Sequence, residues 1–186
     1  NDISGYGRNG TYQGSAATIA DTSNGGSRAY DFTLSGSFID CGNVLDAPSQ
    51  FSISAWVNRG TRTDATGIAG KWNGTGYMLY NVTPQVAIDG GPHTSGSQQL
   101  PASTWQHLCA TYEGTTINRY QDGTLTSTQA HAPPSTTSAT YQIGAYTSVT
   151  FRSLIDDVRQ YSRALTQAEI THLATSRGIE GSPSAP

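Results

Sequence analysis

The clearest alternation of apolar and polar positions lies in TWQHLCATYEGTTINRYQDGTL, residues 104–125. Leu108 and Tyr112 fall on one face of its first half, while Trp105 and Cys109 fall on the other. A period of two residues is typical of a β-strand, and apolar groups on both faces indicate a strand that is covered on each side. The pattern therefore predicts a strand inside a sheet, with further structure packed against both faces.

Two turn signals follow in the same stretch. Gly114, after Glu113, tolerates a positive φ, and Asp122-Gly123 is a typical hairpin pair. Residues 115–121 between them are polar but rich in β-forming residues. These signals predict an antiparallel pair of strands followed by another hairpin.

Similar patterns predict strands along most of the chain. In FSISAWVN, apolar Phe51, Ile53, Ala55 and Val57 alternate with a second face that carries Trp56. The remaining strands are expected at residues 28–34, 37–42, 76–82, 85–90 and 141–146. Glycine-rich residues 1–26 are expected to form loops, and 59–76 a long polar loop that contains the apolar piece GIAGKW.

A single helix is expected near the C-terminus. Thr166 and Glu169 have the spacing of a capping box, and Leu165 can pack against Ile170 as a hydrophobic staple. Gly178 is a suitable stop signal. This predicts a helix of about three turns after a long run of strands.

Composition narrows the function classes. The chain has 186 residues, 21 glycines, 12% charged residues and a formal net charge of −3. These values favour one turn-rich β domain and argue against nucleic acid or an anionic membrane surface as a partner. Two cysteines, Cys41 and Cys109, allow either a disulfide or two separate thiols.

Four stretches in order carry a resemblance: SRAYDFTLSGSFIDCGN, FSISAWVN, WQHLCATYEGTTINRYQDGTL and SLIDDVRQYSRALTQAEI. They resemble laminin G-like domains of the concanavalin A-like lectin/glucanase superfamily. The resemblance implies an all-β fold, a two-sheet antiparallel jelly-roll sandwich with one short C-terminal helix. We expect this domain at residues 1–179 and a linker or disordered tail at 180–186. It further implies a monomeric module excised from a longer secreted or surface protein, and the style of the C-terminal sequence suggests bacterial origin.

The same resemblance implies a structural calcium ion. In that superfamily an aspartate of the closing strand often binds calcium next to the N-terminal segment, and the matching residue is Asp156 in IDDV. Asp2 and Asp31 are candidates for the same oxygen-rich shell. The alternative is that Asp156 forms an ion pair with an arginine such as Arg159.

Catalysis is not expected. Glycoside hydrolases need two opposed carboxylates, and no predicted strand carries two acids at alternating positions. The three glutamates are Glu113 in a turn, Glu169 in the capping box and Glu180 in the tail. A divergent glycoside hydrolase is therefore the weakest alternative.

Binding is the remaining expectation, with a glycan or an extracellular protein as partner. Sugar rings stack on aromatic faces, and their hydroxyls bond to amides, hydroxyls and short acids. Candidates from the variable region are Trp72, Asn73, Tyr77, His93 and Tyr146. Tyr77 and Tyr80 could instead pack a sheet face, Trp56 and Trp105 are assigned to the core, and an adhesive or structural module without glycan specificity is the alternative function.

Overall fold

The computed structural model describes residues 5–15, 17–21, 27–32, 36–46, 48–61, 66–80, 85–89, 92–93, 100–146, 149–151 and 154–177. One helix and sixteen strands lie in this part of the chain. The strands are β1 Thr11–Gln13, β2 Ala17–Asp21, β3 Ser27–Asp31, β4 Phe38–Asp40, β5 Phe51–Asn58, β6 Gly67–Trp72, β7 Gly76–Tyr80, β8 Gln85–Ile88, β9 Pro92–His93, β10 Gln106–Tyr112, β11 Thr116–Gln121, β12 Thr124–Ala130, β13 Tyr141–Ile143, β14 Ala145–Tyr146, β15 Val149–Thr150 and β16 Leu154–Tyr161; the helix is α1, Gln167–Thr175.

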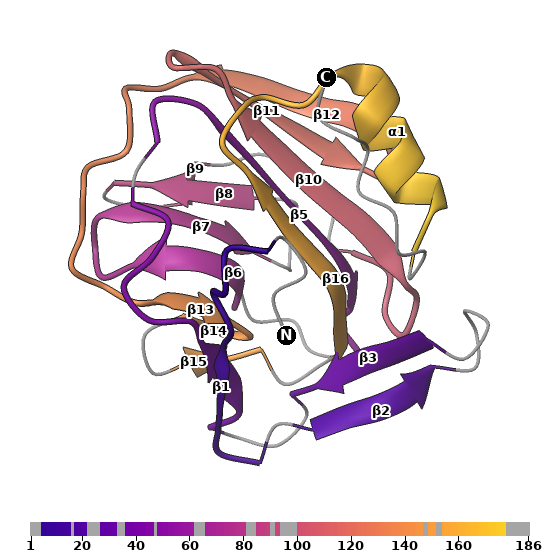
Figure 1. The fold of residues 1–186 in the computed structure, drawn as a ribbon. Coiled ribbons are helices and arrows are strands. Elements are labelled where there is room, and N and C mark those ends of the chain that lie inside the picture. The colour runs from indigo at the N-terminus through magenta and orange to yellow at the C-terminus, as the bar shows by residue number, and fades with distance from the viewer. Residues whose placement is uncertain are drawn as a thin grey trace.

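Two seven-stranded sheets pack face to face (Figure 1). Sheet A has the order β1-β4-β13-β6-β7-β8-β9, and sheet B has the order β12-β11-β10-β5-β16-β3-β2. Strands β14 and β15 form a separate two-stranded ribbon. Every recorded strand pair is antiparallel, so the expected antiparallel jelly-roll sandwich is confirmed.

The centre of sheet B follows the alternation seen in the sequence. β10 lies between β5 and β11, with Leu108 opposite Ala55 and Tyr112 opposite Phe51. These four side chains are almost fully buried between the sheets. Each buried aliphatic or aromatic side chain contributes about 1.5–3 kcal/mol of transfer free energy, so this row anchors the sandwich.

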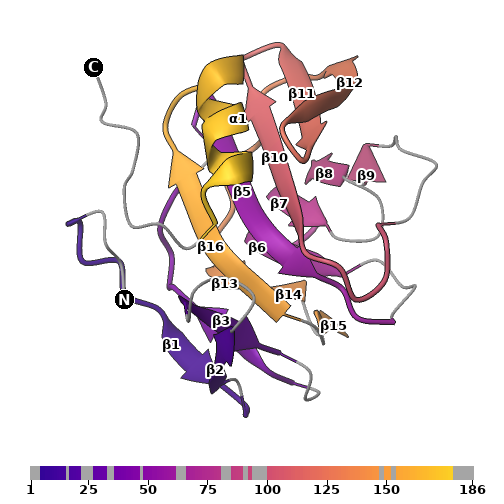
Figure 2. The same cartoon turned by 90° about the vertical axis from the view of Figure 1, so that its right-hand side faces the viewer.

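Helix α1 covers the other face of sheet B, on the side away from sheet A (Figure 2). Ile170 and Leu173 pack there against Cys109 and Tyr120, together with Leu165. Thr166 caps the helix, and the reciprocal bonds of the capping box with Glu169 are present. The predicted helix start is confirmed, whereas Gly178 lies outside the described residues.

Three sequence expectations were wrong. Residues 11–13 and 17–21 form β1 and β2 instead of loop, because β4 and β3 supply their backbone partners. GIAGKW forms strand β6 in the middle of sheet A, paired with β7 and β13. Trp56 and Trp105 are half-buried on the helix side of sheet B, and neither belongs to the core between the sheets.

Lys71 is the single lysine of the sequence and is fully buried at 0% exposure. Its ammonium donates to Asn43 Oδ1 at 2.5 Å and forms an ion pair with Asp46. Asp46 itself is largely exposed. A charge taken out of water needs such partners, so the loop that carries Asn43 and Asp46 is fastened to β6.

The cysteines are separate thiols: Cys41 follows β4 in sheet A, and Cys109 lies under α1 on sheet B. No helix in the described ranges is long and apolar enough to cross a membrane.

Candidate functional site

The outer face of sheet A is polar at its β1 edge. Ile39 points into the core, so its neighbour Asp40 points to the opposite, outer face. The strand register sets Thr11 and Gln142 on either side of Asp40. Side chains that are paired across strands share one face, so a hydroxyl, a carboxylate and an amide form one row.

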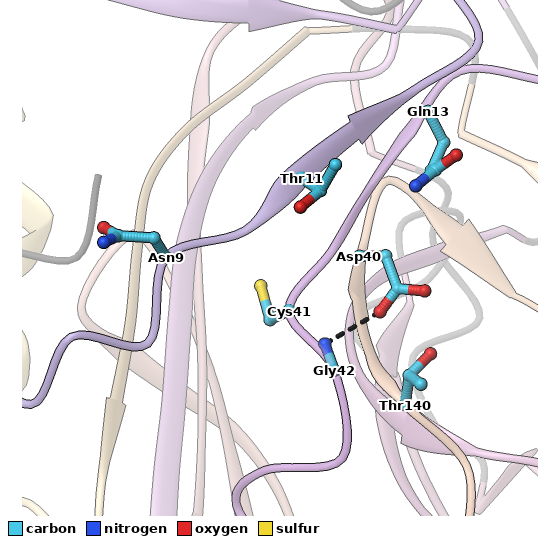
Figure 3. Close-up of a pocket in the computed structure, with 7 residues that line it drawn as sticks. All are labelled: Asn9, Thr11, Gln13, Asp40, Cys41, Gly42 and Thr140. Carbon is cyan, nitrogen blue, oxygen red and sulfur yellow. Dashed lines mark hydrogen bonds between the residues drawn. The ribbon is translucent and has the colours of Figure 1, made fainter.

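A pocket of about 390 Å³ opens next to this row and is called here the β1–β4 pocket (Figure 3). Asp40 Oδ1 accepts a hydrogen bond of 2.8 Å from the backbone N–H of Gly42, and this bond orients the carboxylate. No other hydrogen bond of Asp40 is recorded among the described residues. The pocket is lined by Asn9, Thr11, Gln13, Asp40, Cys41, Gly42 and Thr140.

The lining of the β1–β4 pocket suits a polyhydroxylated ligand. Amides and hydroxyls can both donate and accept hydrogen bonds, and the carboxylate accepts from ligand hydroxyls. Gly42 presents no side chain, which leaves room between Asp40 and Thr140. Small polar groups that converge on a concave surface are the usual means by which proteins orient sugars and similar ligands.

Two of the predicted binding residues lie close to this face. Tyr141 pairs with Lys71, and continuing that register by one residue sets Thr140 beside Trp72. Trp72 is nevertheless only 8% exposed, because it packs with Met78, Tyr80 and Ala87. Asn73 is exposed in the turn after β6, where its Oδ1 accepts hydrogen bonds from the hydroxyls of Thr75 and Thr137.

Of the other three predicted residues, only Tyr77 has a described side chain. Tyr77 is 1% exposed in the core, and its hydroxyl donates to the carbonyl of Leu45 at 2.8 Å and accepts from Gln160. Tyr77 therefore packs the sandwich, the alternative considered from the sequence. His93 lies in β9 and Tyr146 in β14, but their side chains lie outside the described part.

The structure adds one aromatic residue that the sequence reasoning missed. Tyr6 is 75% exposed, in the segment that supplies Asn9, Thr11 and Gln13 to the pocket, and the guanidinium of Arg8 lies 4.8 Å from the centre of its ring. Tyr12 is 47% exposed, but it pairs with core-facing Ile39 and its ring centre lies 6.0 Å from that of Tyr30, so its side chain lies on the face of β1 opposite the pocket. The sequence signal for Tyr6 is an aromatic residue among small polar ones at the N-terminus.

Asp156 lies on the helix side of sheet B, where it is 7% exposed. Its Oδ2 is 3.4 Å from Arg177 Nε, and burial raises the pKa of Asp156 to about 6. The guanidinium of Arg177 also lies 3.8 Å from the ring centre of Trp105 and 5.8 Å from that of Trp56.

The arginine recorded beside Asp156 is therefore Arg177, while the recorded ion pair of Arg159 is with Asp157. Arg159 forms two bonds to Asp157, Nε to Oδ1 at 2.7 Å and Nη2 to Oδ2 at 3.0 Å. The reason is an irregularity in β16 between Asp156 and Arg159, where Asp157 has a φ of 49°. The irregular backbone shifts the register and sets Asp157 and Arg159 side by side.

One feature of this face favours a calcium ion and one opposes it. Asp31 pairs with Leu154, two residues before Asp156, so both carboxylates lie on one face of neighbouring strands. Arg177, however, places a positive charge at the Asp156 carboxylate, where a calcium ion would also have to bind. Asp2 lies outside the described residues, and within the described ones no group of three or more histidine, cysteine or acidic side chains could hold a metal.

The two described glutamates have structural partners. Glu169 accepts from both terminal nitrogens of Arg163, at 2.9 and 2.5 Å, and from the backbone N–H of Thr166. These bonds lower the pKa of Glu169 to about 2. Glu113 is exposed and accepts from Asn118 at 3.2 Å.

The fold and the pocket define a lectin-like β-sandwich. The model of the concanavalin A-like lectin/glucanases superfamily matches residues 34–171, and the chain belongs to this superfamily. The match is of the laminin G type that the sequence resembled. No curated protein matches the chain in sequence.

Solved structures share the fold at low sequence identity. Domain 4 of AbnA, an extracellular arabinanase of Geobacillus stearothermophilus solved with arabinotriose, has a TM-score of 0.70 and 21% identity over 89% of this chain and 87% of that domain. The binding domain of Paraclostridial Mosquitocidal Protein 1 has a TM-score of 0.69 and 14% identity over 94% of this chain and 49% of that domain. A pentraxin from Limulus polyphemus has a TM-score of 0.55 and 14% identity over 74% of this chain and 76% of its own.

Proposed function

We propose that this domain is a non-catalytic, extracellular carbohydrate-binding module that holds a neutral oligosaccharide at the β1–β4 pocket. The observation that carries the proposal is the convergence of a carboxylate, two amides and two hydroxyls from Asp40, Asn9, Gln13, Thr11 and Thr140. Exposed Tyr6, on the segment that leads into β1, adds an apolar face for a sugar ring. The arabinotriose complex of the arabinanase domain supports arabinan as the first glycan to test.

The test is titration of purified protein with arabinan fragments and an arrayed glycan panel. Asp40→Asn keeps an Oδ1 acceptor for Gly42 while it removes the charge, and Gln13→Ala removes one pocket amide. Each variant should bind about tenfold more weakly, since one lost polar contact corresponds to roughly 1–1.5 kcal/mol. Thr171→Ala, at an exposed position of α1 on the far side of sheet B, is the matched control and should bind like the wild type.

If both pocket variants bind glycan as tightly as the wild type, the glycan binds at another place on the domain and not at the β1–β4 pocket. Capture of a protein partner, with no glycan bound above background, would favour the adhesive alternative, which the structural likeness to the toxin binding domain also suggests. Turnover of a polysaccharide would contradict the non-catalytic assignment.

Calcium is a separate proposal for the face that carries Asp31 and Asp156. Bound calcium would supply a structural cross-link between β3 and β16, and it would require Arg177 to move from the Asp156 carboxylate. If an ion binds, calcium should raise the melting temperature over chelator-treated protein, because a ligand of the native state stabilises it by mass action. Equal melting temperatures in calcium and in chelator would refute the site.

A further inference from the structure

Arg119 is a buried cation with an unusual environment. It lies on β11 opposite core-facing Ala110, so its side chain enters the space between the sheets, where it is 1% exposed. Nη1 donates to Ser127 Oγ at 2.8 Å and Nη2 donates to Gln129 Oε1 at 3.1 Å, while buried Nε has no hydrogen-bond partner. Both acceptors are neutral side chains of β12.

Three other arginines have a carboxylate partner, whereas buried Arg59 donates from Nε to the backbone carbonyl of Leu100. Arg159 holds Asp157 through Nε and Nη2, Arg163 holds Glu169 through both terminal nitrogens, and Arg177 faces Asp156. Arg119 is more buried than any of these three, and no carboxylate is recorded at it in the described part.

An unpaired buried charge is unfavourable, and burial lowers the pKa of Arg119 accordingly. The guanidinium joins β11 to β12 through Ser127 and Gln129, but these two bonds leave Nε unused, and an apolar side chain of similar volume would avoid the cost of the buried charge. The group is, however, well suited to a bidentate carboxylate, since Nε is unused and Nη2 is bound only to a neutral amide.

Access to Arg119 is through the edge of sheet B. β12 is the terminal strand of this sheet, and Ser127 and Gln129 are half-exposed. The side chain of Gln129 can rotate to solvent and release Nη2, after which Nε and Nη2 present the same fork that Arg159 presents to Asp157. Gln106 and Gln121 add uncharged amides on the neighbouring strands, joined by a bond of 2.5 Å.

We propose that Arg119 anchors a second binding site, which takes a carboxylate group at the β11–β12 edge. The carboxylate belongs either to a sugar acid or to a small free acid, and both present the same two oxygens to Arg119. This site is on the other sheet from the β1–β4 pocket, and it does not depend on the glycan proposal.

The experiment follows the arginine Nε–H signals of the whole domain by nuclear magnetic resonance during titration with sodium glucuronate. Two further titrations are run in parallel. One uses sodium acetate as a carboxylate without a sugar, and the other uses glucose with sodium chloride at equal ionic strength as a control without a carboxylate. The Arg119 signal, assigned by its loss in Arg119→Lys, should shift saturably with both carboxylates and not with glucose and chloride. Tighter binding of glucuronate than of acetate would identify a sugar acid, and equal binding a free carboxylate.

The variants make the test specific. Arg119→Gln should weaken glucuronate binding at least tenfold, the loss expected for a charge-assisted bidentate pair. Arg163→Gln, a charge-matched change at an arginine already paired with Glu169, should leave it unchanged. If Arg119→Gln does not fold, the shift of the Arg119 Nε–H signal in the wild-type titrations is sufficient to test the proposal. A signal that does not move, or that moves equally with chloride, overturns the proposal whether or not the β1–β4 pocket binds arabinan.

Discussion

His107 shows how one buried residue links the sheet to solution pH. It is 1% exposed on the helix side of β10, with its ring centre 5.5 Å from that of Trp56. Burial, with a smaller contribution from the charge of Arg159, lowers the pKa of His107 to about 4. The unfolded chain, with an ordinary value of 6.5, therefore binds more protons than the folded one between these limits.

The contribution of neutral His107 to stability is complete above about pH 6.5 and is lost as the pH falls through about 4. Asp156 acts in the opposite sense, because its raised pKa gives a contribution that is lost as the pH rises through about 6. The pH dependences of the free energy of unfolding that come from His107 and Asp156 have opposite signs and partly cancel. A weak pH dependence of the wild type would therefore conceal two larger contributions.

His107→Gln should separate them. The difference in free energy of unfolding, variant minus wild type, should be larger at pH 4 than at pH 7 by up to about 3 kcal/mol. The reason is that the variant lacks the imidazole whose protonation destabilises the folded wild type. Urea unfolding at pH 7, 5.5 and 4 measures the difference. The comparison is His172→Gln, which removes a histidine at an exposed position of α1 and is measured at the same three pH values. A difference between His107→Gln and wild type that stays constant with pH would contradict the assignment.

At the scale of elements, α1 is attached to sheet B at both ends. Its first turn is closed by the Thr166–Glu169 capping box and by Arg163. Its last turn is held by Trp56, whose Nε1 donates to the carbonyl of Leu173 at 3.2 Å, and by Arg177 above Trp105. The helix therefore protects the face of sheet B that carries Cys109 and His107.

Removal of the cap should weaken this attachment. Thr166→Ala leaves the N–H of Glu169 without its side-chain acceptor, and should lower the free energy of unfolding by about 1 kcal/mol. Chemical denaturation gives the value. Thr175→Ala, in the exposed last turn, is the comparison; its hydroxyl bonds only to carbonyls of the same helix, so no loss is expected. Equal losses in the two variants would mean that the cap contributes nothing specific.

The sequence predicted the elements that carry their own pattern. β10 and β5 alternate strongly and α1 has a complete capping box, so each was located without knowledge of its neighbours. β1, with the sequence TYQ, has no such pattern and exists because β4 pairs with it. β6 was missed because it is short and contains two glycines within a polar region.

The candidate site depends on register, which a single sequence does not reveal. Thr11, Asp40 and Thr140 meet only because β1, β4 and the start of β13 align across sheet A. Arg177 reaches Asp156 because the helix returns over sheet B. The exposure of single side chains also depends on the fold: the sequence left Tyr77 open between a binding surface and a sheet face and gave no role to Tyr6.

At the scale of the whole molecule, the sandwich is held by burial without a covalent link between the sheets. Cys41 and Cys109 are not bridged by a disulfide, and burial raises the pKa of Cys109 to about 12. The reactive form of a cysteine is the thiolate, so Cys109 should be inert in the folded protein. Cys41 is half-buried at the pocket and is the more accessible thiol.

A reductant should leave the melting temperature unchanged. A thiol-specific disulfide reagent should modify one cysteine in the native protein and both after unfolding, as counted by the released chromophore. Cys41→Ser should abolish the native reaction and Cys109→Ser should not. A lower melting temperature in reductant would instead reveal a bridge.

The burial of Lys71 has a practical consequence for anyone who handles this domain. Acylating reagents act on exposed lysine side chains, and the single one in this sequence is enclosed behind Asn43 and Asp46. Acylation at Lys71 would therefore report opening of the sandwich itself, and its rate would measure unfolding without the introduction of a labelled residue.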